Sequence, residues 1–139
     1  MSRATPKMRE LSQRLVAEEM KGEKSVVDEA VAPFFIYEKL RPHLSILMGK
    51  MGTRALFSRS LSLSRLELPY LLSVTVSDEG LLAGFDTAEA SLSFQEIFEY
   101  RIVLVAHLIG LLVAFIGSNL TLRLLRERWP ELTFKDLEP

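Results

Sequence analysis

The chain of 139 residues contains no cysteine. This absence excludes disulfide bonds, thiolate nucleophiles and cysteine-based zinc sites, and it is typical of proteins in a reducing compartment. The sequence also lacks histidine pairs and carboxylate-rich loops at metal-ligand spacing. It contains no glycine-flanked serine elbow and no glycine-rich phosphate loop. We therefore expect no metal, no cofactor and no catalytic residue, and we expect that the protein is not an enzyme.

Neither sign of charge is in excess, because the net charge at pH 7 is −1. The chain as a whole should therefore attract neither nucleic acid nor anionic membranes. Its first residues are charged rather than apolar, so we expect no secretion signal and a cytoplasmic location. Hydrophobic residues make up 48% and charged residues 25%, values that are typical of globular proteins. We expect one helical domain over 1–139, with a peripheral N-terminal helix within 1–24 and a polar tail at 131–139.

One long apolar stretch is present, the sixteen residues Ile102–Gly117, whose single polar side chain is His107. Its length favours a helix over a strand. Ser93 and Glu96 have the spacing of a capping box, which predicts that the helix begins near them. We predict one helix over Phe94–Trp129, and we expect the rest of the domain to pack around it.

Small residues recur along one side of this predicted helix at spacings of three and four. They are Ala106, Gly110, Ala114, Gly117 and Thr121. Small side chains let another backbone approach closely, so we interpret them as a helix-contact stripe. Glycine inside a helix costs about 1 kcal/mol relative to alanine, which favours a packing role. We also expect the helix to bend or break at 117–119.

A helix that is apolar on all sides is buried either in protein or in lipid. A membrane-spanning helix needs about 20 apolar residues to cross ~30 Å of hydrocarbon. The sixteen residues of the apolar stretch would cover roughly 24 Å. We therefore favour a core or subunit-interface helix, and a short membrane span at 102–120 is the alternative.

Two further segments have helical periodicity before the apolar stretch. Pro6–Met20 has an apolar face formed by leucine and methionine, which predicts a surface helix. Val26–Met51 keeps helical spacing of its apolar residues over its second half. Pro42 lies inside that pattern and should kink the helix or divide it in two.

Thr53–Leu66 fits both a strand and a helix, and we favour the helix, with Thr53 as N-cap and Pro69 as terminator. The residues that follow are rich in β-branched side chains and contain a glycine turn, which predicts a β-hairpin near residues 72–85. The predicted fold class is thus mainly α: a helical bundle around one long apolar helix, with a small β-hairpin.

A buried polar line is the one candidate for a ligand pocket. Tyr100, His107 and Ser118 fall within roughly 40° of one another around the predicted helix. These side chains could surround a bound ligand or proton. The alternative is a single neutral histidine that is hydrogen-bonded within a core or interface, and we favour it because buried polar groups usually find partners.

Charge is arranged in two adjacent blocks of opposite sign. The basic block is Lys39, Arg41, Lys50, Arg54, Arg59 and Arg65. The acidic block is Glu67, Asp78, Glu79, Asp86, Glu89, Glu96 and Glu99. The basic block could form a surface for phosphate or lipid head groups. We favour mutual neutralisation of the two blocks, and so expect negligible binding to duplex DNA or anionic vesicles at physiological salt.

Three stretches together resemble a known group of proteins. They are residues 37–44 (YEKLRPHL), 56–63 (LFSRSLSL) and 111–124 (LLVAFIGSNLTLRL). They are similar to stretches in a group of small uncharacterised bacterial proteins, over roughly Phe34 to Trp129. The resemblance implies a bacterial, cytoplasmic protein, and it implies no activity, cofactor or catalytic residue.

These observations lead to one functional expectation with two alternatives. We expect a non-enzymatic protein-interaction or regulatory module that forms a homo-oligomer, most simply a homodimer, because so apolar a helix is hard to cover within one short chain. The first alternative is a small inner-membrane-associated protein with one short span. The second is a helical ligand-binding domain with a pocket near His107. Nucleic acid is not an expected partner.

Overall fold

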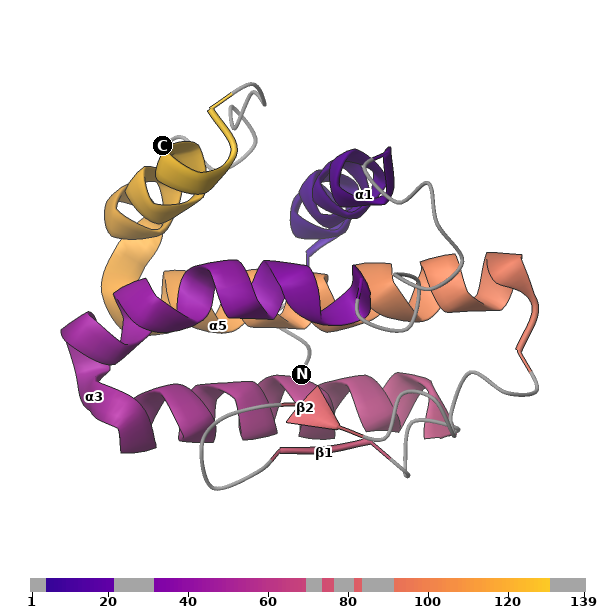
Figure 1. The fold of residues 1–139 in the computed structure, drawn as a ribbon, viewed down its shortest axis with the longest axis horizontal. Coiled ribbons are helices and arrows are strands. Elements are labelled where there is room, and N and C mark those ends of the chain that lie inside the picture. Colours follow the sequence, from indigo (N-terminus) through magenta and orange to yellow (C-terminus); the bar gives the residue numbers. More distant parts are fainter. Residues whose placement is uncertain (1–4, 22–31, 70–73, 77–81, 84–91, 131–139) are drawn as a thin grey trace.

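The computed structural model of the chain describes residues 5–21, 32–69, 74–76, 82–83 and 92–130. Its elements are α1 (Pro6–Lys21), α3 (Ala32–Glu67), β1 (Thr75–Val76), β2 (Leu82–Ala83) and α5 (Phe94–Arg128) (Figure 1). The predicted fold class, mainly α-helical with a small β-hairpin, is confirmed. Thr53–Leu66 is helical as predicted, and α3 ends two residues before Pro69.

The start of α5 is set by the capping box that the sequence predicts. The Ser93 hydroxyl accepts a hydrogen bond from the Glu96 backbone N–H at 3.1 Å. The Glu96 carboxylate accepts one from the Ser93 backbone N–H at 2.9 Å. These bonds satisfy N–H groups that the first turn of a helix leaves without partners. The predicted long helix is confirmed, and it ends one residue earlier than expected, at Arg128.

The break in α3 lies at Gly49 and not at Pro42. Gly49 has φ 78° and ψ 170°, the one non-helical conformation inside α3, and Figure 1 shows the helix folding back there. This conformation is almost restricted to glycine. The predicted division of the helix at Pro42 is wrong, because the backbone of α3 is helical there. Pro42 is exposed, and its missing N–H removes one helical hydrogen bond.

α5 breaks at Gly117, as predicted, with φ 86° and ψ 161°. Both breaks lie at the same end of the molecule, on the left in Figure 1. Each is followed four residues later by a threonine whose hydroxyl donates to the glycine carbonyl at 2.8 Å, Thr53 to Gly49 and Thr121 to Gly117. Such bonds from a side chain back to a carbonyl accompany helix bending. Thr53 is therefore not the predicted N-cap, because it lies one turn inside the second segment of α3.

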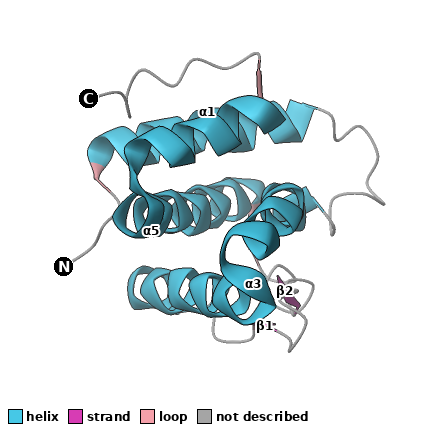
Figure 2. Cartoon of the chain, turned by 90° about the vertical axis from the view of Figure 1, so that its left-hand side faces the viewer, coloured by secondary structure: helices cyan, strands magenta, loops and turns pink. Residues whose placement is uncertain are grey.

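The first segment of α5 forms the centre of the core, between α1 and α3 (Figure 2). Every residue from Val103 to Leu112 is buried. α1 contributes Leu11 and Leu15, both fully buried in the same cluster. The apolar face of α1 thus contributes to the common core and covers one side of α5.

Polar groups inside this core pair with backbone carbonyls. The Tyr37 hydroxyl donates to the Leu104 carbonyl of α5 at 3.1 Å and lies 2.8 Å from the Ser60 hydroxyl. Ser60 in turn donates to the Phe57 carbonyl at 2.8 Å. Burial raises the pKa of Tyr37, although the hydrogen bond with Ser60 opposes the change. Tyr37 is therefore a neutral donor that joins both segments of α3 to α5.

The β-hairpin packs on the second segment of α3. β1 and β2 are antiparallel, with Thr75 opposite Ala83 and Val76 opposite Leu82. The Arg65 guanidinium donates to the carbonyl of Val74, which is fully buried. An isolated hairpin is marginally stable in water, so this attachment to the helix supports it. The predicted turn at 78–80 lies outside the described residues.

Candidate functional site

One polar cluster joins the three helices of the described residues, α1, α3 and α5. An Arg9 guanidinium nitrogen on α1 lies 2.8 Å from both carboxylate oxygens of Glu67, the last residue of α3. His107 on α5 forms a hydrogen bond through Nε2 with the same carboxylate. The His107 side chain is 1% exposed and that of Glu67 35% exposed. Glu67 is therefore the link through which a surface arginine and a buried histidine hold the helices together.

The two partners of Glu67 stabilise its charged form. Partial burial acts to raise the pKa of Glu67, but the hydrogen bonds and charges of Arg9 and His107 outweigh it and lower that pKa below 4.5. The other His107 ring nitrogen, Nδ1, is buried and has no hydrogen-bond partner among the described residues.

The lowered pKa predicts that Glu67 contributes to acid sensitivity. A carboxylate whose pKa is lower in the folded state stabilises the fold above its unfolded pKa, and this contribution is lost as the pH falls through the folded pKa. We expect stability to decline below about pH 4.5, and we expect Glu67→Gln to make that decline shallower. Urea unfolding at several pH values measures both. Glu10→Gln, which removes an exposed carboxylate from α1, is the control, and an equal effect of both variants would contradict the assignment.

The residues of the predicted ligand pocket lie on both sides of the break in α5. Tyr100 and His107 are buried in the first segment of α5. Ser118 is half-buried and follows the break at Gly117. The helical periodicity that aligned the three residues assumes an uninterrupted helix, so it does not extend to Ser118. His107 is buried and hydrogen-bonded to the partly exposed Glu67 side chain.

The predicted helix-contact stripe is divided by its position in the fold. Ala106, Gly110 and Thr121 are buried, whereas Ala114 and Gly117 are exposed. Gly117 has a role other than close packing, because a Cβ added there would meet no atom within 4 Å. The buried members lie within the core, and the exposed members lie at the break in α5.

The predicted basic surface is dispersed over several environments. Lys39 pairs with Glu19 of α1 at 2.5 Å and lies 5.5 Å from the centre of the Trp129 ring. Lys50 and Arg59 are exposed. The remaining members are half-buried and engaged in interactions: Arg41, Arg54 and Arg65. Glu67, the first residue of the acidic block, pairs with Arg9 and His107, neither of which belongs to the basic block.

Large apolar side chains are exposed at the two helix breaks. Ile46 is 85% exposed, Met51 81%, Phe115 63% and Leu47 46%. Each lies within three residues of Gly49 or Gly117, and both breaks lie at one end of the molecule (Figure 1). We call these four side chains the bend surface. Solvent-exposed apolar groups gathered at one end of a protein are typical of a binding surface.

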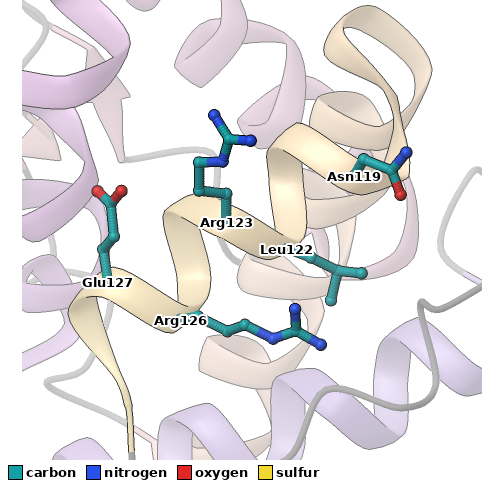
Figure 3. A pocket seen from close by; sticks show the side chains of 5 residues that line it. All are labelled: Asn119, Leu122, Arg123, Arg126 and Glu127. Carbon is teal, nitrogen blue, oxygen red and sulfur yellow. The ribbon is translucent and has the colours of Figure 1, made fainter.

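A cavity of about 390 Å³ lies on the second segment of α5 (Figure 3). It is lined by Asn119, Leu122, Arg123, Arg126 and Glu127. Glu127 lies 3.5 Å from the His43 side chain of α3. Both arginines and Glu127 are exposed, so the cavity is open to solvent at the surface. The positive charges of its two arginines are partly offset by the Glu127 carboxylate.

Within the described residues, Gln95–Arg128 is long and apolar enough to cross a membrane, with a mean hydropathy of 2.2 over its most apolar part. Of that part, 56% is buried inside the protein. The apolar side chains of α5 are therefore buried in the core over much of the helix. Exposed residues of this apolar part lie next to Gly117.

The sequence predictions missed one feature of the site. The pairing of Glu67 with His107 joins residues 40 positions apart, and the sequence holds no local signal for it. The break at Gly49 lies close to the predicted boundary between Val26–Met51 and Thr53–Leu66. No protein-family model matches this chain, and neither the curated proteins nor the solved structures contain a significant match to it.

Proposed function

We propose that the protein is a non-enzymatic interaction module that docks through the bend surface. The observation that carries the proposal is the exposure of Ile46, Leu47, Met51 and Phe115 at one end of a molecule whose other described apolar residues largely form a single core. Covering each large apolar side chain with a partner would be favourable by about 1.5–3 kcal/mol relative to leaving it exposed to water.

The helix breaks support this proposal because they present the bend surface. Gly49 and Gly117 hold conformations that cost other residues roughly 1–3 kcal/mol. At each of these glycines the helix changes direction. The residues next to the glycine therefore lie at the end of the molecule. Such conformations persist where the surrounding structure requires them, and they cluster at binding and switch regions.

The Arg9–Glu67–His107 cluster fits a structural role better than a catalytic one. His107 is 1% exposed, and its Nε2 already bonds to Glu67. A general base must reach the proton that it removes from a substrate, and a ring buried in this way has no access to one. The cluster instead holds the last residue of α3 against α1 and α5.

Photocrosslinking in cells tests the proposed function. Benzoylphenylalanine in place of Met51 should form adducts with a partner molecule on irradiation, and mass spectrometry of the adduct identifies it as protein or lipid. The same amino acid in place of Leu66 is the matched control, because Leu66 is also 81% exposed but lies at the last turn of α3, away from the breaks. Equal labelling at both positions, or no adduct at position 51, would contradict docking through the bend surface.

A further inference from the structure

The chain segments that carry the bend surface contain bases and no acids. From Lys39 to Leu66, which includes Gly49, there is no aspartate or glutamate. From Tyr100 to Arg126, which includes Gly117, there is none either. Lys50 lies next to Met51 and is exposed. The exposed charge next to the apolar side chains within these segments is thus the positive charge of Lys50.

We infer that the partner of the bend surface is a membrane that contains anionic lipids. This inference rests on the proposed docking function and names its partner. An apolar surface bordered by lysine and arginine matches the layered chemistry of a bilayer, in which hydrocarbon lies beneath anionic head groups. Ile46, Leu47, Met51 and Phe115 enter the boundary of the acyl chains, while Lys50 remains at the level of the phosphates.

Lys50 is suited to this position by its chemistry as well as by its place. Its long aliphatic stem can lie along apolar surface while the ammonium group reaches the polar layer. Basic side chains near an anionic membrane each strengthen binding by about fivefold at low salt. Lys50 is therefore the basic residue that the inference places at the level of the phosphates.

A second copy of the chain fits the bend surface less well. The commonest dimers are two-fold symmetric, so that the same patch of each subunit contacts its counterpart. Such a contact would bring Lys50 of each copy toward the same basic segments of the other. Those segments supply no carboxylate to neutralise the charge, and like charges at an interface disfavour association.

Within the described residues, some charges of the basic and acidic blocks have partners outside the opposite block. Glu67 pairs with Arg9 and His107, and Glu96 caps α5. Lys39 takes its carboxylate from Glu19 of α1. Lys50 is exposed and lies next to Met51, so its charge is available to an external anion. The acids at 78, 79, 86 and 89 lie outside the described residues.

Vesicle flotation with the purified full-length protein tests the inference. Vesicles of phosphatidylcholine alone are compared with vesicles that also contain phosphatidylglycerol, at about 50 and 200 mM salt, a range over which contacts with several phosphates weaken strongly. We expect binding to the anionic vesicles, weaker binding at the higher salt, and little binding to phosphatidylcholine alone. Absence of binding to anionic vesicles at the lower salt would overturn the inference.

Three variants separate the apolar and the electrostatic contributions. Ile46→Ser combined with Met51→Ser should weaken binding by about a hundredfold, because two exposed apolar side chains are lost. Lys50→Glu should weaken it by at least about tenfold. Leu66→Ser is the matched control and should bind like the unaltered protein. All changed residues are exposed, and thermal unfolding of each variant checks that the fold is intact.

The remaining outcomes distinguish this inference from the proposed function. If the control loses as much binding as the double variant, adsorption is nonspecific and the inference fails. If vesicles do not bind but the double variant abolishes a dimer seen by sedimentation, the occupant is a second copy. A protein adduct at position 51 without vesicle binding would likewise overturn the lipid partner, while docking through the bend surface would stand.

Discussion

Replacing Leu108 with alanine is expected to lower the free energy of unfolding by about 2–5 kcal/mol. Leu108 is fully buried and lies next to His107 in the α5 segment that contacts both α1 and α3. The loss combines the transfer free energy of the deleted methyl and methylene groups with the cost of the cavity that they leave. Urea unfolding in detergent-free buffer, followed by circular dichroism, measures the change.

Leu66→Ala is the matched control for this substitution, because the same side chain is 81% exposed there. It should change stability by less than about 0.5 kcal/mol, as surface substitutions usually do. If Leu108→Ala costs no more than Leu66→Ala, then α5 is not packed in a protein core in solution. That outcome would favour lipid, and not α1 and α3, as the covering of the apolar helix.

Replacing either break glycine with alanine should also be strongly destabilising, by about 1–3 kcal/mol at each position. Gly49 and Gly117 have φ values of 78° and 86° with extended ψ, where a Cβ is strained by its own backbone. A Cβ at either position would meet no neighbouring atom within 4 Å. The cost is therefore conformational, and serine should be as unfavourable as alanine when both are compared by thermal unfolding.

Gly52→Ala is the control for the break glycines. Gly52 has helical backbone, and its added Cβ would lie 3.1 Å from both Cβ and Cγ of the half-buried Met48. Alanine gains up to about 1 kcal/mol in helix propensity over glycine, which offsets this close contact. We expect Gly52→Ala to be far better tolerated than either break substitution. Equal costs at all three positions would show that the positive φ values do not occur in solution.

The start of α5 could be predicted because its cause is local. Ser93 and Glu96 satisfy each other's backbone N–H groups within one turn, so the capping box is readable from four residues. The hairpin near 72–85 was predictable for a similar reason, since β-branched residues and turn chemistry are also local features.

The break in α3 lies close to the predicted boundary between Val26–Met51 and Thr53–Leu66, whereas the division predicted at Pro42 is absent. Proline inside a helix predicts a kink, yet Pro42 lies on an exposed face where the helix tolerates it. Glycine within a helix is only weakly informative. Whether Gly49 adopts a positive φ depends on how the second segment of α3 packs against α5, and that packing is a tertiary effect.

The candidate surface could be predicted only in part. The sequence shows which residues are basic or apolar, but the exposure of Met51 and the burial of Leu56, on the same helix, depend on what covers each one. The link from Glu67 to His107 spans 40 positions. Contacts of this kind arise when the helices come together, so no periodicity within a single helix encodes them.

Amide hydrogen exchange of α5 in detergent-free buffer tests most directly whether this helix is the core of a self-sufficient fold. If it is, the amides of Val103–Leu112 should be among the slowest in the protein and should open only with global unfolding. Those around Gly117, where side chains are exposed, should exchange faster. Rapid exchange throughout Val103–Leu112, or a protein that dissolves only in detergent, would contradict the account.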